Sequence, residues 1–170
     1  DQLFGKYEST GYYRPLLLSK QDTLTLNSSF KLQLIFNDAT EYGDSTKSVD
    51  MSVYRIAEQW RDKTIKNSDE LLLDQSQLMG QFTYTNEDTI EVALSDSLFA
   101  DYISIQESDD DLRDSLYNHG YFGFALVPSA ANSKIVFPDL ENSKIFYVDD
   151  SDEDTVSISF KNFAFNLKRT

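Results

Sequence analysis

The chain has 170 residues, a net charge of −14 at pH 7, no cysteine, and 10 Tyr and 12 Phe beside one Trp. This length fits one domain, which folds without needing a disulfide or a metal. The lack of cysteine excludes disulfides and thiolate metal sites. The acidic balance argues against nucleic acid as a partner, because phosphate binding depends on clustered Lys and Arg. The charge itself is explained by solubility, with binding of a cation or a basic protein as the alternative.

The first half of the chain contains three segments that are candidates for strands, two of which alternate. A short apolar run, Leu16–Leu18, is a candidate for a buried strand. Residues 30–36 alternate apolar and polar side chains and then become continuously apolar, as in a strand with one face in the core. Residues 49–56 alternate again, with Val49, Met51 and Val53 on one face. Two half-buried strands are therefore expected before Trp60.

The middle of the chain changes its hydrophobic period. Residues 81–94 alternate on both sides of a polar tetrapeptide, which predicts a β-hairpin. From Ser95 the apolar residues recur at helical spacing, and the acidic run that follows predicts a second helical turn ending near Gly120. We therefore expect a short helical insertion around 95–117.

Strands resume in the last third of the chain, over residues 121–127, 135–137, 144–148 and 155–167. In the last of these, the apolar residues lie on even positions up to Phe160 and on odd positions from Phe163. One face of a regular strand cannot hold both sets, so a β-bulge or bend is predicted at Lys161–Asn162.

This succession of short strands around one helical insertion predicts an all-β protein. The expected fold is an antiparallel β-sandwich, in particular a jelly roll, that forms one domain over residues 1–170. Residues 1–29 begin with a mixed, glycine-punctuated stretch and are predicted to be a peripheral N-terminal segment.

The sequence offers little for catalysis, and we predict that the protein is not an enzyme. His119 is the single histidine, and no Gly-x-Ser-x-Gly elbow accompanies it, so we interpret it as a polar residue in the turn before a strand. The six glycines form no phosphate-binding loop. With 29 acidic residues, carboxylate pairs at a glycosidase spacing are expected by chance.

The most specific polar feature is the acidic stretch 149–154. Asp150, Asp152 and Asp154 form the first half of a calcium loop, since oxygen ligands at alternate positions can converge on a hard cation. Thr155 and Lys161 stand where an EF-hand loop needs its glycine and its distal glutamate. The two hypotheses are a weak calcium site, with calcium as the one candidate cofactor, and a solvated hairpin loop. The acidic run Asp109–Asp114 is interpreted in the same way, with a helix N-terminus as the favoured alternative.

Aromatic side chains could also bind a ligand, since exposed rings stack on sugars. The alternative for each is a place in the core of the sandwich. The candidate ligand-binding residues are Tyr12, Tyr13, Trp60, Tyr117 and Tyr121.

A family resemblance rests on three stretches in a fixed order. They are Tyr42–Thr46 followed by Val53–Ile56, Leu78–Gly80 followed by Asp88–Leu94, and Tyr121–Leu126. This order resembles an uncharacterised surface lipoprotein family of Bacteroidota and is distantly similar to the DNRLRE-type jelly-roll modules of secreted proteins. The resemblance implies a jelly roll at the outer membrane or outside the cell, and some DNRLRE-type modules are associated with polysaccharide binding. No functional residue carries over.

These observations predict a non-catalytic extracytoplasmic module for binding or scaffolding, as a surface lipoprotein domain or a subunit of a cell-surface assembly. Its partner would be a protein in that assembly or a polysaccharide. The alternative function is a carbohydrate-binding module, and the third is a glycosidase or lyase. Because the chain starts at Asp1, we expect a processed piece whose signal peptide or lipid-bearing cysteine lies upstream, and membrane contact only through that anchor.

Overall fold

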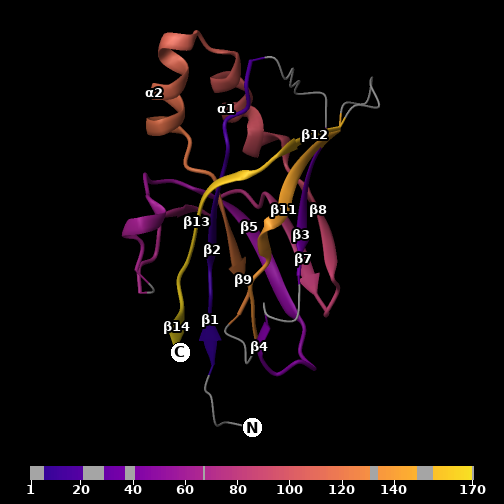
Figure 1. Ribbon diagram of the computed structural model, residues 1–170. Helices are drawn as coiled ribbons and strands as arrows, with labels where there is room; N and C mark the ends of the chain where they lie inside the picture. Colours follow the sequence, from indigo (N-terminus) through magenta and orange to yellow (C-terminus); the bar gives the residue numbers. More distant parts are fainter. Residues whose placement is uncertain are drawn as a thin grey trace.

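The computed structural model describes residues 6–20, 29–36, 41–66, 68–130, 134–148 and 155–169. Two antiparallel sheets pack face to face, and two helices close one end of the molecule (Figure 1). Every strand pairing among these residues is antiparallel. The predicted all-β, antiparallel, sandwich-like architecture is therefore confirmed.

Each sheet draws its strands from distant parts of the chain. The four-stranded sheet has the order β12 (Thr155–Ile158), β11 (Asp139–Val148), β3 (Ser29–Ile35) and β8 (Thr89–Leu94). The six-stranded sheet has the order β13 (Phe160–Phe165), β2 (Gly11–Pro15), β9 (Phe124–Pro128) and β5 (Val49–Ile56), with β6 (Leu73–Asp74) and β7 (Gly80–Tyr84) both paired to β5. Two ribbons join β1 (Tyr7–Glu8) to β14 (Lys168–Arg169) and β4 (Glu41–Gly43) to β10 (Lys134–Val136).

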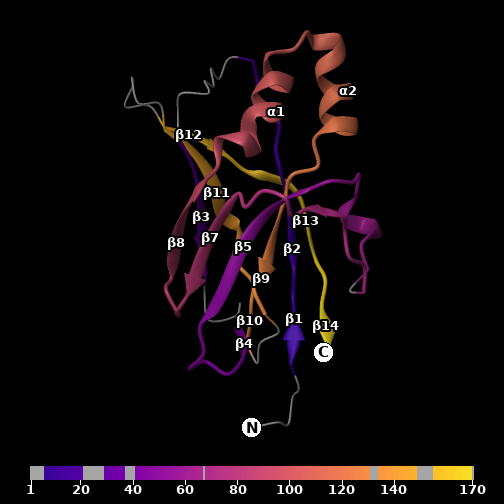
Figure 2. The same ribbon diagram turned by 180° about the vertical axis from the view of Figure 1, so that it is seen from behind.

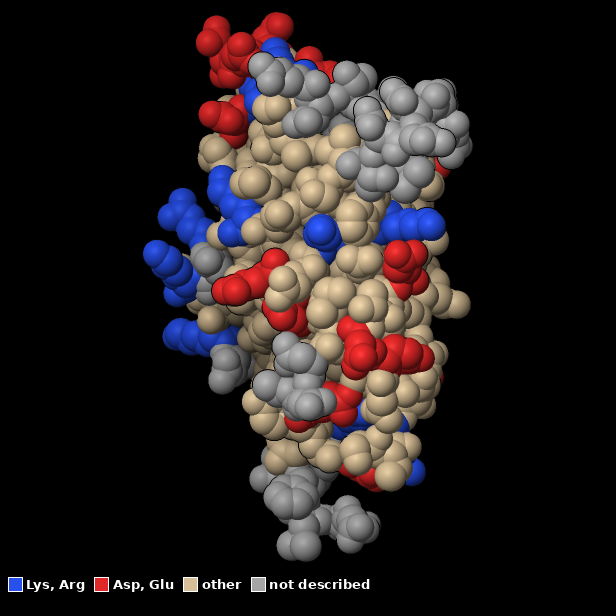
Figure 3. Space-filling model, turned by 45° about the vertical axis from the view of Figure 1, so that its right-hand side comes forward, with Lys and Arg blue, Asp and Glu red and all other residues tan. Residues whose placement is uncertain are grey.

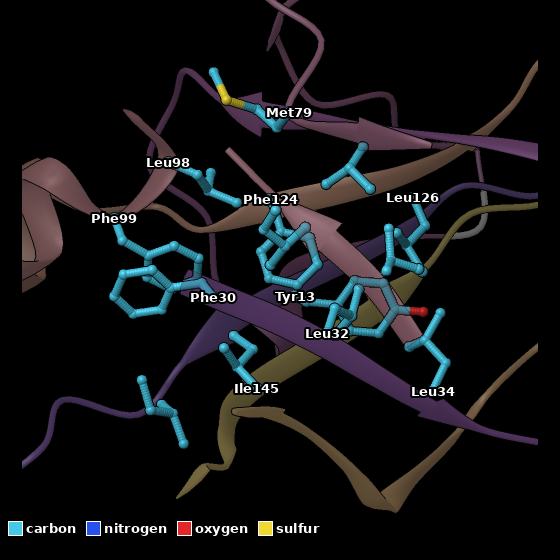
Figure 4. Packing of buried hydrophobic residues seen from close by; sticks show 14 of the residues in the cluster. Tyr13, Phe30, Leu32, Leu34, Met79, Leu98, Phe99, Phe124, Leu126 and Ile145 are labelled. Atoms are coloured by element: carbon cyan, nitrogen blue, oxygen red, sulfur yellow. The ribbon is translucent and has the colours of Figure 1, made fainter. Parts of the chain in front are cut away.

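The main core fills the space between the two sheets. Alternation puts Phe30, Leu32 and Leu34 of β3 inside, each at most 1% exposed. Phe30 stacks on Phe99 of the first helix, with ring centroids 4.0 Å apart and planes 5° from parallel (Figure 4). Helix, four-stranded sheet and six-stranded sheet thus share one apolar cluster, to which Phe124 also belongs.

Strand β2 corrects the expectation of a peripheral N-terminal segment. It lies between β13 and β9 in the six-stranded sheet, and all five of its residues are buried. Gly123, just before β9, has φ +84°, and a Cβ there would lie 2.0 Å from the Tyr13 carbonyl oxygen. Glycine is therefore required where β9 approaches β2. The apolar run Leu16–Leu18, expected as a strand, follows β2 and is not itself a strand.

The predicted hairpin over residues 81–94 is wrong in its pairing. Its two strands exist, but β7 pairs with β5 in one sheet and β8 pairs with β3 in the other. The turn between them, with Asn86 at φ 74°, therefore connects the two layers rather than two neighbouring strands. Alternation identified the strands, but it does not tell in which sheet each one finds its partner.

The helical insertion is confirmed. Helix α1 (Asp96–Glu107) buries Leu98, Phe99 and Tyr102 against the main core. Helix α2 (Asp110–Gly120) ends at the glycine that the sequence indicated, and its buried residue is Tyr117. A short 3₁₀ helix, η2, spans Asp62–Thr64.

The predicted irregularity near Lys161 is also confirmed. The chain leaves the four-stranded sheet after β12 and enters the six-stranded sheet as β13, so its apolar face must change. The register with β2 shifts between Phe160 and Asn162, which places a bulge at Lys161.

A second, smaller apolar cluster lies on the outer face of the six-stranded sheet. Residues 57–66 and 68–72, here named the covering segment, stand beside this sheet on the side away from β8 (Figures 1 and 2). Trp60 of this segment packs with Tyr12, Ile56 and Ala125, and we name this group the outer cluster. The Trp60 indole N–H donates to the Phe122 carbonyl oxygen at 2.8 Å. The six-stranded sheet is therefore covered on both faces over part of its area.

Candidate functional site

The five aromatic residues predicted to bind a ligand are all inside the protein. Their side chains are between 1% and 5% exposed: Tyr12, Tyr13, Trp60, Tyr117 and Tyr121. Stacking on a sugar needs an exposed ring face. These five residues are therefore not available as a sugar-binding platform, and the alternative interpretation as core residues holds for each.

Tyr117 shows what such a residue does instead. Its hydroxyl donates to the Pro15 carbonyl oxygen at 2.6 Å, and the Arg14 guanidinium lies 4.2 Å from its ring centroid. Arg14 also donates to the Tyr117 carbonyl oxygen at 2.5 Å. Burial raises the pKa of the Tyr117 hydroxyl to about 12. These contacts fasten α2 to β2, which is a structural role.

The predicted calcium ligands Asp150, Asp152 and Asp154 lie outside the described residues, so the calcium hypothesis stays a prediction. Within the described ranges, no three His, Cys, Asp or Glu side chains are grouped as a metal site requires. Asp110 and Asp111 lie in the first turn of α2, in agreement with their interpretation as a helix N-terminus. His119 is exposed in the last turn of the same helix, at the surface.

A better candidate is the part of the six-stranded sheet that the covering segment leaves open. Strand register sets the outward-facing side chains in rows, because residues on alternate positions share a face. Ser52 of β5 lies between Val127 of β9 and Gln81 of β7. In the neighbouring row, Asp50 pairs with Thr83, whose hydroxyl donates to the Asp50 carboxylate at 2.6 Å. Apart from Val127, the residues named on the open outer face therefore have polar side chains.

Two depressions occupy this face. The first, of about 370 Å³, lies between the covering segment and the β1–β14 ribbon, and we name it the Lys168 groove. Its lining includes Glu8, Thr10, Leu72, Val127, Asn166 and Lys168. The second, of about 330 Å³, is the Asp50 groove, lined by Asp50, Ser52, Gln81, Thr83 and Ser129 among others. Since Val127 and Ser52 are cross-strand neighbours, the two grooves adjoin.

Asn166 fixes the geometry of the Lys168 groove. It is 6% exposed, and its side-chain oxygen accepts from the Thr10 backbone N–H at 2.9 Å. Its amide nitrogen donates to the Tyr12 hydroxyl at 2.9 Å and to the Asp69 carbonyl oxygen at 3.0 Å. One side chain therefore joins β2, the C-terminal strand and the covering segment. A wall built this way is rigid before any ligand arrives.

The charges of the Lys168 groove are paired with each other. The Lys168 ammonium lies 2.7 Å from the Glu70 carboxylate, and this hydrogen bond raises the pKa of Lys168. Burial raises the pKa of the Tyr12 hydroxyl, which accepts from the Leu71 backbone N–H at 3.3 Å. At neutral pH the groove therefore offers hydroxyl and amide groups, the Lys168–Glu70 ion pair and Glu8, the cross-strand neighbour of Lys168. This set suits hydrogen bonding to a neutral or polar ligand.

Sequence reasoning did not identify Thr10, Asn166 or the Asp50 groove. The alternation of residues 49–56 did place Asp50 and Ser52 on a common face away from the core. Nothing in the sequence, however, shows that β7 and β9 bring Thr83 and Ser129 beside them, because these pairings join segments far apart in the chain.

No protein-family model, no curated protein and no solved structure matches this chain. Among the helices in the described ranges, none has the length and apolar character needed to cross a membrane.

Proposed function

We propose that this chain is a non-catalytic binding or scaffolding module that works outside the cytoplasm, as a surface lipoprotein domain or a subunit of a cell-surface assembly. One observation carries the proposal: the adjoining Lys168 and Asp50 grooves on the outer face of the six-stranded sheet. Together they offer a long, shallow surface held by sheet register, of the kind that binds an extended partner rather than an enclosed small substrate.

A protein partner is favoured over a sugar by an apolar patch in the wall of the Lys168 groove, which lies beside the polar groups of the groove. Leu72 is 60% exposed there, next to the half-buried Leu71 and Leu73. An apolar patch with a polar rim is typical of a protein interface. The aromatic rings that sugar stacking needs are turned into the two clusters, as shown by Tyr12 and Trp60.

Carbohydrate binding is the second candidate, and the Asp50 groove favours it. Its hydroxyl, amide and carboxylate groups, from Ser52, Gln81 and Asp50, are the side chains that hydrogen-bond sugar hydroxyls. A jelly-roll topology and the membrane anchor implied by the family resemblance stay predictions that accompany either candidate.

The test uses the purified chain against a glycan array and against proteins of the cell envelope. Ser52→Arg and Thr10→Arg would fill one groove each, and Ser157→Arg is the matched control, because Ser157 is exposed on β12 in the other sheet. We expect saturable binding that both groove variants weaken at least tenfold and the control leaves unchanged, a loss of about 1.4 kcal/mol or more.

The outcomes separate the candidates. Groove-dependent binding of an envelope protein supports the first, and groove-dependent binding of a glycan supports the second. Binding that all three variants retain would move the site elsewhere, and turnover of any glycan would overturn the non-catalytic proposal.

A further inference from the structure

Two surfaces outside the grooves each expose a pair of large apolar side chains. On α2, Leu112 and Leu116 are 56% and 43% exposed and lie one turn apart, so they share one helix face. At the edge of the six-stranded sheet, Phe163 of β13 and Leu167 just after it are 50% and 41% exposed. We name these the helix face and the β13 edge.

The helix face is surrounded by negative charge. Residues 96–120 contain seven Asp or Glu and one Arg, a net charge of −6. Asp109, Asp110, Asp111 and Asp114 are all exposed around the two leucines, and Asp110 pairs with Lys20 at 3.0 Å. Tyr117 is the buried residue of α2, and Arg113 is half-buried, whereas Leu112, Leu116 and the four Asp are exposed.

The β13 edge lies in a region with a net positive charge. Residues 160–169 contain two Lys and one Arg and no acidic residue. Helix η2 of the covering segment packs beside β13, and Arg61, Lys63 and Lys66 in and around η2 are exposed. The covering segment also has four acidic residues, one of which pairs with Lys168, so residues 57–72 and 160–169 together carry a net charge of +2. In Figure 3, red side chains gather at the helical end and also lie over the lower half, and blue side chains are most numerous along one side of the molecule.

We infer that the helix face of one copy of this chain docks on the β13 edge of a second copy. Each surface presents two large apolar groups, and the net charges of the two surroundings are opposite in sign. Docking would bury all four apolar side chains and bring acidic residues of α2 toward Lys161 and the cations of the covering segment. It would also cover a sheet edge, which proteins seldom leave open.

A contact between two different surfaces has a geometric consequence. Each copy keeps one free helix face and one free β13 edge, so the association repeats head to tail, as a ring if the rotation closes and as a filament if it does not. The occupant is a second copy because one chain carries both complementary surfaces, although they meet where the Lys161 ammonium lies 5.1 Å from the ring centroid of Tyr117.

The net charge of −14 opposes this association, but salt screens repulsion between distant charges more than attraction between charges in contact. At physiological salt the Debye length is about 8 Å, so repulsion between the bulk of two copies is screened more than attraction across a direct contact. In ~1 M salt, with a Debye length of about 3 Å, the contact attraction is screened as well. We therefore expect assembly at physiological salt that weakens at least tenfold in high salt.

The experiment is sedimentation velocity with one variant for each surface. Asp111→Lys with Asp114→Lys reverses the helix face, and Lys66→Glu with Lys161→Glu reverses the β13 edge. Glu141→Lys is the control, because Glu141 is exposed on β11 away from both surfaces. Circular dichroism establishes that every variant is folded.

The expected pattern is specific to a head-to-tail contact. Wild type and Glu141→Lys assemble beyond a dimer, and each surface variant alone is monomeric. An equimolar mixture of the two surface variants forms a one-to-one dimer and stops there, because it contains one intact helix face and one intact β13 edge. A chain that carries both reversals assembles again.

Wild type that stays monomeric up to ~1 mM at physiological salt, a concentration that reveals even millimolar affinities, would overturn the inference. Assembly that either surface variant retains, or a mixture that forms no dimer, would overturn it as well. The inference goes beyond the proposed function, since it uses different residues. Ser52→Arg and Thr10→Arg leave both surfaces intact, so failure of ligand binding and failure of assembly are distinguishable.

Discussion

The main core and the outer cluster cover opposite faces of the same six-stranded sheet by different means. The main core is closed by a second sheet and by α1, and it includes residues that are 0% exposed, such as Leu32, Leu98 and Phe99. The outer cluster is closed by an irregular segment and has four buried members, Tyr12, Ile56, Trp60 and Ala125. The first is built from regular alternation, and the second depends on side chains that anchor a loop.

Strand β2 shows what this difference means for the chain. Its neighbours Tyr12 and Tyr13 point to opposite faces, and each is 1% exposed because Tyr12 enters the outer cluster and Tyr13 the main core. A strand between two apolar layers is buried on both faces. In β3, by contrast, one face meets solvent, so buried and more exposed residues alternate along the strand. The four predictions below test whether the two layers are energetically separate.

Alkaline pH should have the largest effect. Burial raises the pKa of Tyr13 and Tyr121 and raises that of Tyr117 to about 12, from the ordinary value of 10.0. A raised pKa in the folded state gives stability that is complete below pH 10 and is lost as pH rises through the folded value. Each of these residues should cost about 1.4 kcal/mol per pH unit above 10.

The measurement is the free energy of unfolding in denaturant as pH rises, with tyrosinate absorbance followed in parallel. Ionisation of the main-core tyrosines should accompany unfolding. If all the tyrosines ionise at ordinary pH while the sheets stay folded, the packing described for the main core is wrong.

Phe99→Ala should be the most destabilising of the substitutions. It removes a ring stacked on Phe30 at 4.0 Å in a site without solvent access, and we expect a loss of about 4 kcal/mol. The control is Leu78→Ala, whose side chain is 48% exposed, with an expected change within about 0.5 kcal/mol. Denaturant unfolding of both variants checks the difference, and equal losses would contradict it.

Asn166→Ala should affect both the C-terminal strand and the covering segment. It leaves the Thr10 N–H and the Asp69 carbonyl oxygen without their partner, with an expected loss of about 2 kcal/mol. Asn142→Ala, at an exposed position on β11, is the matched control. Hydrogen exchange should rise both in the C-terminal strand and in the covering segment, and a rise confined to one of them would show that Asn166 does not couple the two.

Trp60→Phe should have the smallest effect and the most local one. It keeps an aromatic ring but removes the N–H donor to the Phe122 carbonyl oxygen, at a cost of about 1 kcal/mol. The amide of Ala57, bonded to the Leu72 carbonyl oxygen at 2.8 Å, should exchange faster, while the amide of Val53 inside β5 stays protected. Equal acceleration at both amides would mean that the outer cluster and the main core open together.

Prediction from the sequence succeeded where one face of an element meets water. Residues 49–56 alternate and form β5 with those bounds, and the change of period after Ser95 identified α1 and α2. The apolar residues change from even to odd positions around Lys161, and this change identified a bulge. Such a pattern can be recognised only when one face of the strand is apolar and the other is polar. The same reasoning failed at β2, because both faces of this strand lie against apolar clusters.

The candidate site was harder to predict than the fold. Many of its side chains are short and polar, as in any exposed part of a strand. They form a groove only together with neighbours from distant parts of the chain. Thr10 and Asn166 are 156 residues apart and share a hydrogen bond. Exposed aromatic rings are the usual sign of a binding face, and here the candidate rings were needed to fill two apolar layers instead.

The sequence by itself determined the class of the protein, its antiparallel strands, its helical insertion and its bulge, because these follow from local periods of two and of 3.6 residues. Only the tertiary structure decided that β7 and β8 belong to different sheets, that β2 is central, and that Trp60 covers an outer face. Those choices depend on which distant surfaces can be buried together, and burial is a property of the whole folded chain rather than of any segment in it.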